Sequence, residues 1–277
     1  MEIQVNGQRV YCYTGGKTPD AAKPTVLFIH GALNDHSVWI LQSRYFANHG
    51  YNVLCPDLPG HCRSQGLPPT TVEEAADFII ALIRASGLGP VALVGHSFGS
   101  LIAIEAAARE PTLVTRVALI GTAFPMKVSD ALLDGSVNNP VKTMELVNVF
   151  SRATLAAPPS ALGPGTWVYG SSLALAKRVF ASNPHANVFH SSFKACNDYV
   201  GGELAMARII CPVLFILGEL DQMTPPKAAQ SLVKAAKAAT VVTVPSGHHQ
   251  MNEAPEETLT ALRRFLGKLN AKIGNQN

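Results

Sequence analysis

Apolar stretches of strand length alternate with segments of helical spacing along most of the chain. Six stretches of strand length are apolar along most of their residues: 25–30, 51–55, 90–94, 114–120, 212–217 and 240–244. Five other segments show helix-like patterns: 38–48, 72–85, 98–109, 225–236 and 255–269. Continuous apolar strands that alternate with helices are typical of a parallel sheet with helices on both faces. The pattern therefore predicts an α/β fold, although it leaves the order of the strands open.

Two local signals place individual elements more firmly. Asn6-Gly7 separates two strand-like stretches, 2–5 and 9–13, and this dipeptide is a strong hairpin-turn signal. Thr71 is followed three residues later by Glu74, which is the pattern of a capping box. We therefore expect an N-terminal hairpin and a helix that begins just after Thr71.

The alternation of strands and helices is interrupted between residues 124 and 206. This segment shows helix-like patches and no convincing strand, and its prolines include Pro140, Pro158, Pro159, Pro164 and Pro184. Long insertions in compact domains are commonly functional, so we expect a helical cap, or lid, rather than a solvated excursion with its own small core. The predicted division is a core domain of 1–123 and 207–277, with the cap at 124–206.

Side chains of the insertion suggest how such a lid would be used. Apolar residues near its start are candidates for its underside: Val141, Met144, Leu146, Val147, Val149 and Phe150. Three aromatic residues further on are candidates either for the wall of a pocket or for the core of the cap: Trp167, Tyr169 and Phe193. Few charges lie near the start of the insertion, which favours an uncharged or partly apolar ligand.

Composition and charge exclude several classes of protein. Hydrophobic residues make up 47% of the 277 residues and charged residues 15%, which is typical of a globular chain and unlike a disordered one. A net charge of +3 without a run of Lys or Arg gives no electrostatic footprint for nucleic acid. The longest apolar runs are too short for a membrane span. We therefore expect a small-molecule ligand, with neither nucleic acid nor membrane as partner; a homo-oligomer is left open.

Cysteine usage and the N-terminal residues bear on the compartment. The five cysteines are an odd number without CxxC spacing, which argues against a disulfide framework or a zinc site. Residues 1–7 lack the basic and apolar regions of a secretory signal. Both observations predict a cytoplasmic protein with reduced thiols.

The stretch Gly95-His96-Ser97-Phe98-Gly99 lies where a predicted strand passes into a predicted helix. A tight strand-to-helix turn forces its central residue into strained backbone angles, and small neighbours relieve the crowding. Such a turn exposes the hydroxyl of Ser97 at the carboxyl edge of the sheet, next to the free N–H groups of a helix N-terminus. This is the pattern of a nucleophile elbow, and Ser97 is the candidate nucleophile.

A serine nucleophile needs a base, and the base needs an orienting carboxylate. The base candidates are His248 and His249, which follow the strand at 240–244. The acid candidates are Asp221 and its rival Glu219, which follow the strand at 212–217, whereas 121–127 contains no carboxylate. Strand-end positions in the chain order Ser, Asp, His match the logic of α/β-hydrolases.

An oxyanion hole requires two backbone N–H groups near the nucleophile. Phe98 supplies one because it directly follows Ser97. The turn His30-Gly31-Ala32 ends an early predicted strand, and Ala32 offers the second N–H. His30 is expected to brace this loop rather than to take part in chemistry.

Together these motifs resemble the α/β-hydrolase superfamily, in its serine-nucleophile, cap-containing, esterase- or lactonase-like branch. The resemblance rests on His30-Gly31 followed by Trp39, on YNVLCPDLPGHCRS at 51–64, and on Gly95–Gly99, Gly218–Asp221 and Gly247-His248. It covers nearly the whole chain except the insertion. It implies an eight-stranded, mostly parallel sheet with the cap after the sixth strand.

The resemblance also assigns roles. It implies that Ala32 and Phe98 form the oxyanion hole and that His248, directly after Gly247, is the base, with His249 a neighbour in the wall. Cys62 departs from the family pattern, which usually has glycine in that turn. A serine nucleophile disfavours the dehalogenase and epoxide-hydrolase branches, which use aspartate.

The sequence therefore predicts a serine hydrolase that cleaves a carboxylic ester, thioester or lactone of a small, partly apolar substrate through an acyl-enzyme on Ser97, Asp221 and His248. No metal, nucleotide or flavin cofactor is implied. The same three residues also serve carbon–carbon bond hydrolysis, perhydrolysis and acyl transfer to acceptors other than water. A non-catalytic ligand receptor on the same fold is the alternative of another class.

Overall fold

One eight-stranded sheet organises the computed structural model, which describes residues 1–154 and 167–267. The strands lie in the order β1-β2-β4-β3-β5-β6-β7-β8. Their bounds are β1 Glu2–Val5, β2 Gln8–Tyr13, β3 Thr25–Ile29, β4 Asn52–Pro56, β5 Val91–His96, β6 Val114–Ile120, β7 Val213–Gly218 and β8 Ala239–Val244. β1–β2 and β2–β4 pair antiparallel, and all other neighbours pair in parallel. This confirms the predicted, mostly parallel eight-stranded sheet.

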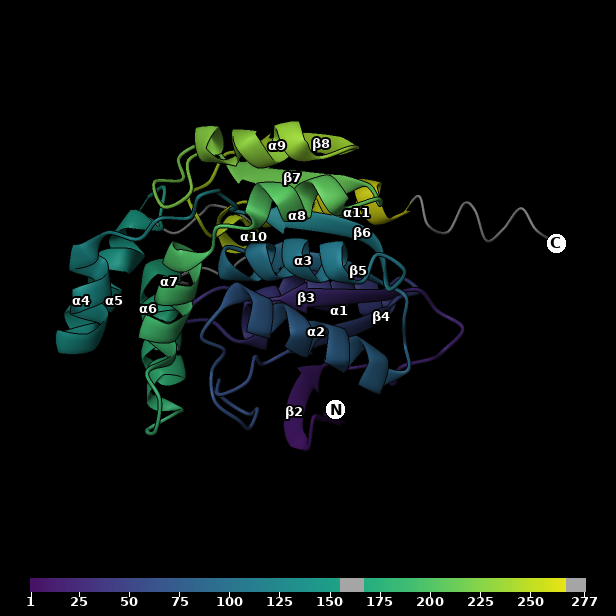
Figure 1. The fold of residues 1–277 in the computed structure, drawn as a ribbon, viewed down its shortest axis with the longest axis horizontal. Helices are drawn as coiled ribbons and strands as arrows, with labels where there is room; N and C mark the ends of the chain where they lie inside the picture. Colours follow the sequence, from purple (N-terminus) through teal and green to yellow (C-terminus); the bar gives the residue numbers. More distant parts are fainter. Residues whose placement is uncertain (155–166, 268–277) are drawn as a thin grey trace.

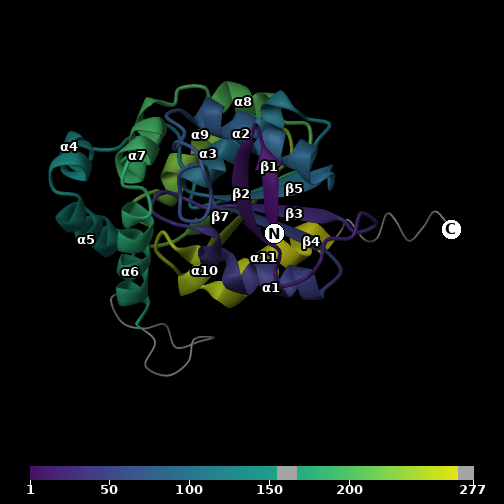
Figure 2. The same cartoon turned by 90° about the horizontal axis from the view of Figure 1, so that it is seen from below.

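Helices cover both faces of the sheet, as Figures 1 and 2 show. One face carries α2 Val72–Ser86, α3 Phe98–Arg109, α8 Gly202–Arg208 and α9 Gln230–Ala235, and the other carries α1 Ile40–Asn48, α10 Gln250–Glu253 and α11 Pro255–Leu266. Alternate residues of β3 enter different cores: Leu27 and Ile29 pack into one, Val26 and Phe28 into the other. Two-sided burial explains why the central strands read as continuous apolar runs. Within the described ranges, no helix is both long and apolar enough to cross a membrane.

The helix cap at Thr71 and the hairpin turn at Asn6-Gly7 are both present in the structure. Thr71 accepts a hydrogen bond from the N–H of Glu74 at 3.1 Å and caps α2. The Glu74 carboxylate reaches back to the N–H of Thr70 rather than to that of Thr71, so the reciprocal bond of the capping box is shifted by one residue. Asn6 and Gly7 have φ angles of 51° and 76°, the positive values that a tight hairpin turn between β1 and β2 requires.

Two predicted helices begin with a turn of 3₁₀ helix, and one short helix was not predicted. The 3₁₀ turns are η1 His36–Trp39, before α1, and η2 Pro226–Ala229, before α9. Asp35 caps η1 by accepting the N–H of Ser37 at 2.8 Å. The unpredicted helix α10 has only four residues, too few to produce a periodic pattern. The last residues of the predicted helix 255–269 lie outside the described residues.

The segment between β6 and β7 forms helices at one end of the molecule, on the left in Figure 1. The cap helices are α4 Asp130–Asn138, α5 Pro140–Phe150, α6 Val168–Ala181 and α7 Val188–Asp198; α8 then packs back on α3. An apolar cluster of cap residues, including Met144 and Phe193, packs around Leu33 from the turn after β3. The cap helices therefore rest on that turn. Residues 155–166, with Pro158, Pro159 and Pro164, lie outside the described residues.

Only part of the apolar surface of α5 faces inward. Met144 is buried and Val147 packs beside it. The other four candidates for the underside of the lid are exposed: Val141, Leu146, Val149 and Phe150. Trp167 is exposed as well, whereas Phe193 is buried. A helix with apolar residues on several faces cannot bury them all against one partner, and this is why composition alone overestimated the inward face.

Candidate active site

Ser97 occupies the sharp turn between β5 and α3. Its φ of 52° and ψ of −120° are strained for a residue with a side chain. A Cβ on Gly95 would lie 2.1 Å from the carbonyl oxygen of Gly99, and a Cβ on Gly99 would lie 2.4 Å from that of Ile29. The two glycines are therefore needed because the first turn of α3 lies against the backbones of β5 and β3.

Hydrogen bonds hold the strained turn in place. The N–H of Ser97 donates to the carbonyl of Ile120 at 3.0 Å. Its own carbonyl accepts the N–H of Ser100 at 2.8 Å and the hydroxyl of Ser100 at 2.6 Å. That hydroxyl also contacts Thr122 Oγ1 at 2.8 Å. These bonds involve only the backbone of Ser97, so its half-buried hydroxyl is left for chemistry.

Asp221 lies in the turn after β7, where donors surround its carboxylate. The N–H groups of Met223 and Thr224 donate to Oδ1 at 2.9 and 2.8 Å. The hydroxyl of Thr224 donates to Oδ2 at 2.7 Å, and His248 Nδ1 donates to the same oxygen at 2.9 Å. Gln250 Nε2 approaches Oδ2 at 3.4 Å. The carboxylate is buried, and hydrogen bonds to both of its oxygens fix its position.

Burial alone would make this carboxylate harder to ionise. It raises the pKa of Asp221, but the charge of His248 and the hydrogen bonds from His248 and Thr224 outweigh it and hold that pKa below its ordinary value. Asp221 is therefore ionised at neutral pH and can stabilise a positive imidazole beside it.

His248 is held at three points. Its Nδ1 faces Asp221, its backbone N–H donates to the carbonyl of Ser151 in the segment after α5 at 2.9 Å, and its carbonyl accepts Nε2 of His96 at 2.8 Å. A proton on Nδ1 leaves Nε2 of the neutral ring as the basic nitrogen. Among the described residues, the hydrogen bonds include none between His248 and the hydroxyl of Ser97. Such bonds are often loose in a free enzyme and shorten when substrate binds.

The structure separates the rival candidates. Glu219 is exposed, whereas Asp221 is buried against His248. His249 has its ring 5.9 Å from that of His248 and lines the neighbouring cavity. His30 is buried; its Nδ1 donates to the carbonyl of Gly31 at 2.9 Å and its Nε2 accepts the N–H of Leu58 at 3.1 Å. Both of its nitrogens brace the loop, as expected of a structural histidine.

The turn that carries Ala32 lies against the elbow. A Cβ on Gly31 would lie 2.9 Å from Nδ1 of His96 and 3.1 Å from Cβ of Ser97. Only glycine allows this approach, which brings the turn after β3 next to Ser97. Phe98 is the first residue of α3, where backbone N–H groups lack a partner within the helix. The two expected oxyanion donors thus come from adjoining pieces of backbone.

A small cavity lies between this turn and the cap helices. Its volume is about 40 Å³, and Ala32, Leu33, Asn34 and His249 form the part of its wall that belongs to the core domain. The cap contributes apolar side chains that include Met144 and Phe193. A wider groove of about 430 Å³ shares Asn34, Ser172 and His249 with it and opens beside α6. Of the three cap aromatics, Phe193 lines the cavity.

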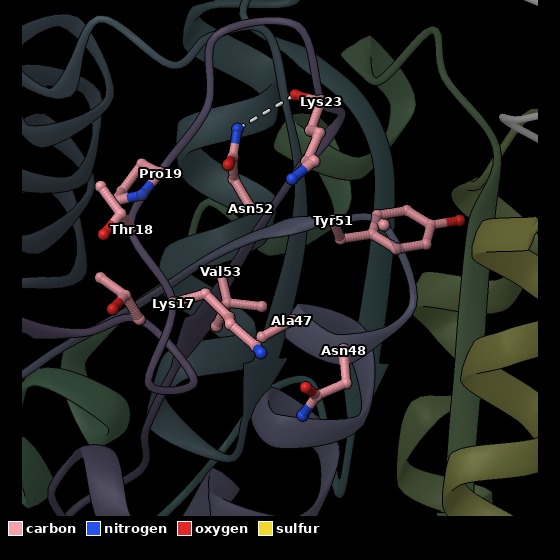
Figure 3. Close-up of a pocket in the computed structure, with 11 residues that line it drawn as sticks. Lys17, Thr18, Pro19, Lys23, Ala47, Asn48, Tyr51, Asn52 and Val53 are labelled. Atoms are coloured by element: carbon pink, nitrogen blue, oxygen red, sulfur yellow. Dashed lines mark hydrogen bonds between the residues drawn. The ribbon is translucent and has the colours of Figure 1, made fainter.

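Other polar features lie away from this site. A pocket of about 300 Å³ lies at the opposite, amino-terminal edge of β3 and β4, where Asn52 donates to the carbonyl of Lys23 (Figure 3). Asp35, His36 and Asp57 come together near η1, but hydrogen-bond donors already occupy their four carboxylate oxygens. This arrangement fixes the loop rather than offering ligands to a metal.

Cys62, the departure from the family pattern, adopts a φ of 43°. The turn therefore keeps the left-handed conformation that a glycine would take there, at some cost in strain. The Cys62 N–H donates to the hydroxyl of Ser182, at the end of cap helix α6, at 2.9 Å. Burial raises the pKa of its thiol to about 12, so it is a poor nucleophile.

Three residues of the site were not predicted: Thr224, His96 and Glu253. Thr224 completes the shell of Asp221, and Glu253 lies at the end of α10 beside His249. His96 belongs to the elbow motif, but its hydrogen bond to the carbonyl of His248 joins residues 152 positions apart, which the motif does not predict. All three residues lie within five positions of a predicted site residue, and this proximity was the only sequence signal for them. It could not identify them, because the direction of a side chain within a turn has no sequence pattern.

Comparisons with known proteins agree with this fold. A model of the alpha/beta hydrolase family matches residues 26–261. The (E)-2-((N-methylformamido)methylene)succinate hydrolase of Acinetobacter baylyi is 26% identical over 259 residues, which cover 88% of this chain and 90% of that one. An esterase from Exiguobacterium antarcticum has a TM-score of 0.81 at 18% identity, over 96% of this chain and 98% of that one. The enol-lactonase from Burkholderia xenovorans LB400 has a TM-score of 0.79 at 19% identity, over 96% and 100%. The two structures share the fold, and the family model covers most of the sequence: the chain is a hydrolase that belongs to the alpha/beta hydrolase family.

Proposed function

We propose that this protein is a serine hydrolase that cleaves a carboxylic ester, thioester or lactone through an acyl-enzyme on Ser97. The observation that carries the proposal is the buried contact of 2.9 Å between His248 Nδ1 and Asp221 Oδ2. It fixes the imidazole as an oriented base, and the chain offers a serine in a strained elbow with which that base can work.

The reaction would proceed in two halves. His248 Nε2 takes the proton of Ser97 as its oxygen attacks the substrate carbonyl, and the N–H groups of Ala32 and Phe98 bind the oxyanion. Asp221 stabilises the positive imidazole, which then gives its proton to the leaving group. In the second half, water loses a proton to His248, attacks the acyl-enzyme and releases the acid and Ser97. Every proton moves between the substrate, water, Ser97 and His248.

The substrate we propose is small and partly apolar. The cavity beside Ala32 has a volume of only about 40 Å³, and on its cap side apolar Met144 and Phe193 lie next to polar Asn148, Ser151 and Ser172. We propose that residues 124–206 act as the cap of the core domain 1–123 and 207–277, because their helices rest on the turn that carries Ala32. A short acyl group fits such a space better than a long chain does. The five free cysteines support a reduced, cytoplasmic location.

Replacement of the nucleophile tests the proposal. The Ser97→Ala variant should lose about 10⁴-fold in kcat on p-nitrophenyl acetate while keeping its melting temperature. A fluorophosphonate should label the wild type and leave the variant unlabelled. Near wild-type turnover by Ser97→Ala would refute the assignment, and labelling without turnover of any ester would favour a ligand receptor. Lactones and vinylogous diketones in the same panel separate ester cleavage from carbon–carbon bond cleavage.

A further inference from the structure

The segment 151–153, at the end of cap helix α5, lies directly on the loop that carries His248. A Cβ on Gly247 would lie 2.6 Å from the N of Ala153 and 2.8 Å from the carbonyl oxygen of Ser151. The two backbones are therefore in contact, and only glycine at 247 permits it. The same carbonyl of Ser151 accepts the N–H of His248 at 2.9 Å. The cap thus touches the backbone of the base itself.

One carboxylate binds both sides of this contact. Glu253 Oε2 accepts the N–H of Ala153 from the cap side at 2.8 Å. Glu253 Oε1 accepts the N–H of His249 at 3.3 Å and lies 3.9 Å from Nη1 of Arg152. The side chains of Glu253 and Arg152 are 7% and 1% exposed, so the arrangement is shielded from water. A buried carboxylate with donors on both oxygens holds those donors in a fixed geometry.

Arg152 extends this connection into the cap. Its guanidinium contacts the hydroxyl of Ser172 on α6 as well as Glu253 on α10. Burial lowers its pKa to about 10, and the charge of Glu253 opposes that shift, so the side chain is positive at neutral pH. On the far side of the loop, His96 holds the carbonyl of His248 at 2.8 Å. The base is therefore fixed between the elbow and the cap.

We propose that Glu253 is a positioning residue for His248, because it fastens the cap segment 151–153 to the loop 247–249. The inference rests on the proposed function, in which His248 is the base. Glu253 itself touches neither Ser97 nor Asp221 in the hydrogen bonds of the described residues. Its effect on the reaction is indirect: it keeps the carbonyl of Ser151 where the N–H of His248 needs it.

Replacing the carboxylate by an amide tests this role. Glutamine has the same shape but only one accepting oxygen, so the Glu253→Gln variant must give up the N–H of Ala153 or that of His249. We expect kcat on p-nitrophenyl acetate, per serine titrated by a fluorophosphonate, to fall about 10- to 100-fold, with KM within about 3-fold, because a base displaced by about 1 Å loses rate rather than binding. Glu257→Gln, on the exposed first turn of α11, is the matched control and should keep wild-type kcat.

A second variant keeps the test decisive if Glu253→Gln does not fold. Arg152→Met leaves Glu253 in place but removes the cation that links it to the cap, and it should lower kcat about 10-fold in the same assay. A purely structural role would lower the melting temperature and leave kcat per titrated serine unchanged in folded variants; that result would overturn the inference. If Ser97→Ala stays active, the proposed function itself fails. If Ser97→Ala is inactive and both variants keep full kcat, only the positioning role fails.

Discussion

At the scale of single residues, histidines whose tautomers are set by their hydrogen-bond partners build the site. The carbonyl of His248 requires a proton on Nε2 of His96, and the carbonyl of Gly31 requires one on Nδ1 of His30. Asp221 in turn requires the proton of His248 on Nδ1. In each case the hydrogen-bond partner sets the tautomer. Because Asp221 holds the proton of His248 on Nδ1, the Nε2 atom of the candidate base is left unprotonated.

Thr224 supplies the most direct test at this scale. The Thr224→Val variant keeps the shape of the side chain but removes the hydroxyl that donates to Asp221 Oδ2 at 2.7 Å. We expect kcat/KM on p-nitrophenyl acetate to fall about 10-fold, because a hydrogen bond to a buried carboxylate contributes about 1.5–3 kcal/mol. Thr224→Ser restores the donor and should recover most of the loss. Wild-type kcat/KM for Thr224→Val would show that the hydroxyl does not orient the pair.

At the scale of elements, the elbow depends on how closely α3 approaches the sheet. Gly99 lies on the first turn of α3 against β3, and the N–H of Phe98 starts the same turn. A shift of this helix end would move Phe98, the proposed oxyanion donor, and Ser97, the proposed nucleophile, together. The glycine is thus required by a contact between two elements as well as by its own flexibility.

The Gly99→Ala variant tests this contact. The new methyl would lie 2.4 Å from the carbonyl oxygen of Ile29, a backbone atom that cannot move aside cheaply. We expect urea unfolding to show a loss of about 1–3 kcal/mol in the free energy of unfolding, together with a lower kcat. Gly267→Ala, where a methyl meets nothing within 4 Å and φ is negative, should change stability by less than about 0.5 kcal/mol. Equal stability of the two variants would contradict the packing argument.

Sequence patterns predict some parts of these elements and not others. The bounds of α3 and β6 match the prediction, because α3 follows the elbow and β6 is a mostly buried stretch of strand length. The turn that carries Asp221 was located, but Thr224 was not, since its side-chain direction depends on the turn's three-dimensional path. The role of Glu253 depends on contact with residues about 100 positions away, which no local pattern encodes. Long-range contacts between loops are thus the part of the site that required coordinates.

At the scale of the whole molecule, the carboxyl edge of the sheet, which carries the candidate active site, is where the core and the cap helices meet. The apolar cluster of the cap includes Leu33, which directly follows Ala32 in the turn after β3. The segment after α5 meets the loop of His248, and Cys62 meets the end of α6. The cap helices therefore contact the core through loops that follow three strands. Movement of the cap helices would therefore displace both the turn that carries Ala32 and the loop that carries His248.

Buried histidines also give the whole fold a predictable response to acid. Burial lowers the pKa of His96 to about 3 and that of His61 to about 4, and it lowers the pKa values of His30 and His249 as well. An unfolded histidine titrates near pH 6.5, so below that pH the unfolded chain binds more protons than the folded one. The stabilising effect of these neutral rings is complete above about pH 6.5 and is lost as the pH falls toward 4.

We therefore expect the free energy of unfolding, measured with urea, to fall steeply between pH 7 and pH 5. His96 and His61 should each contribute a loss of about 2 kcal/mol at pH 5, from about 1.36 kcal/mol per pH unit below 6.5. His61→Asn removes one such group and should reduce the slope by about one proton, whereas His185→Asn, at an exposed position, should not change it. A free energy of unfolding that stays constant over this pH range would show that these rings do not carry the acid sensitivity. A steep fall with an unchanged slope in His61→Asn would assign the acid sensitivity in this pH range to the other buried histidines, His30, His96 and His249.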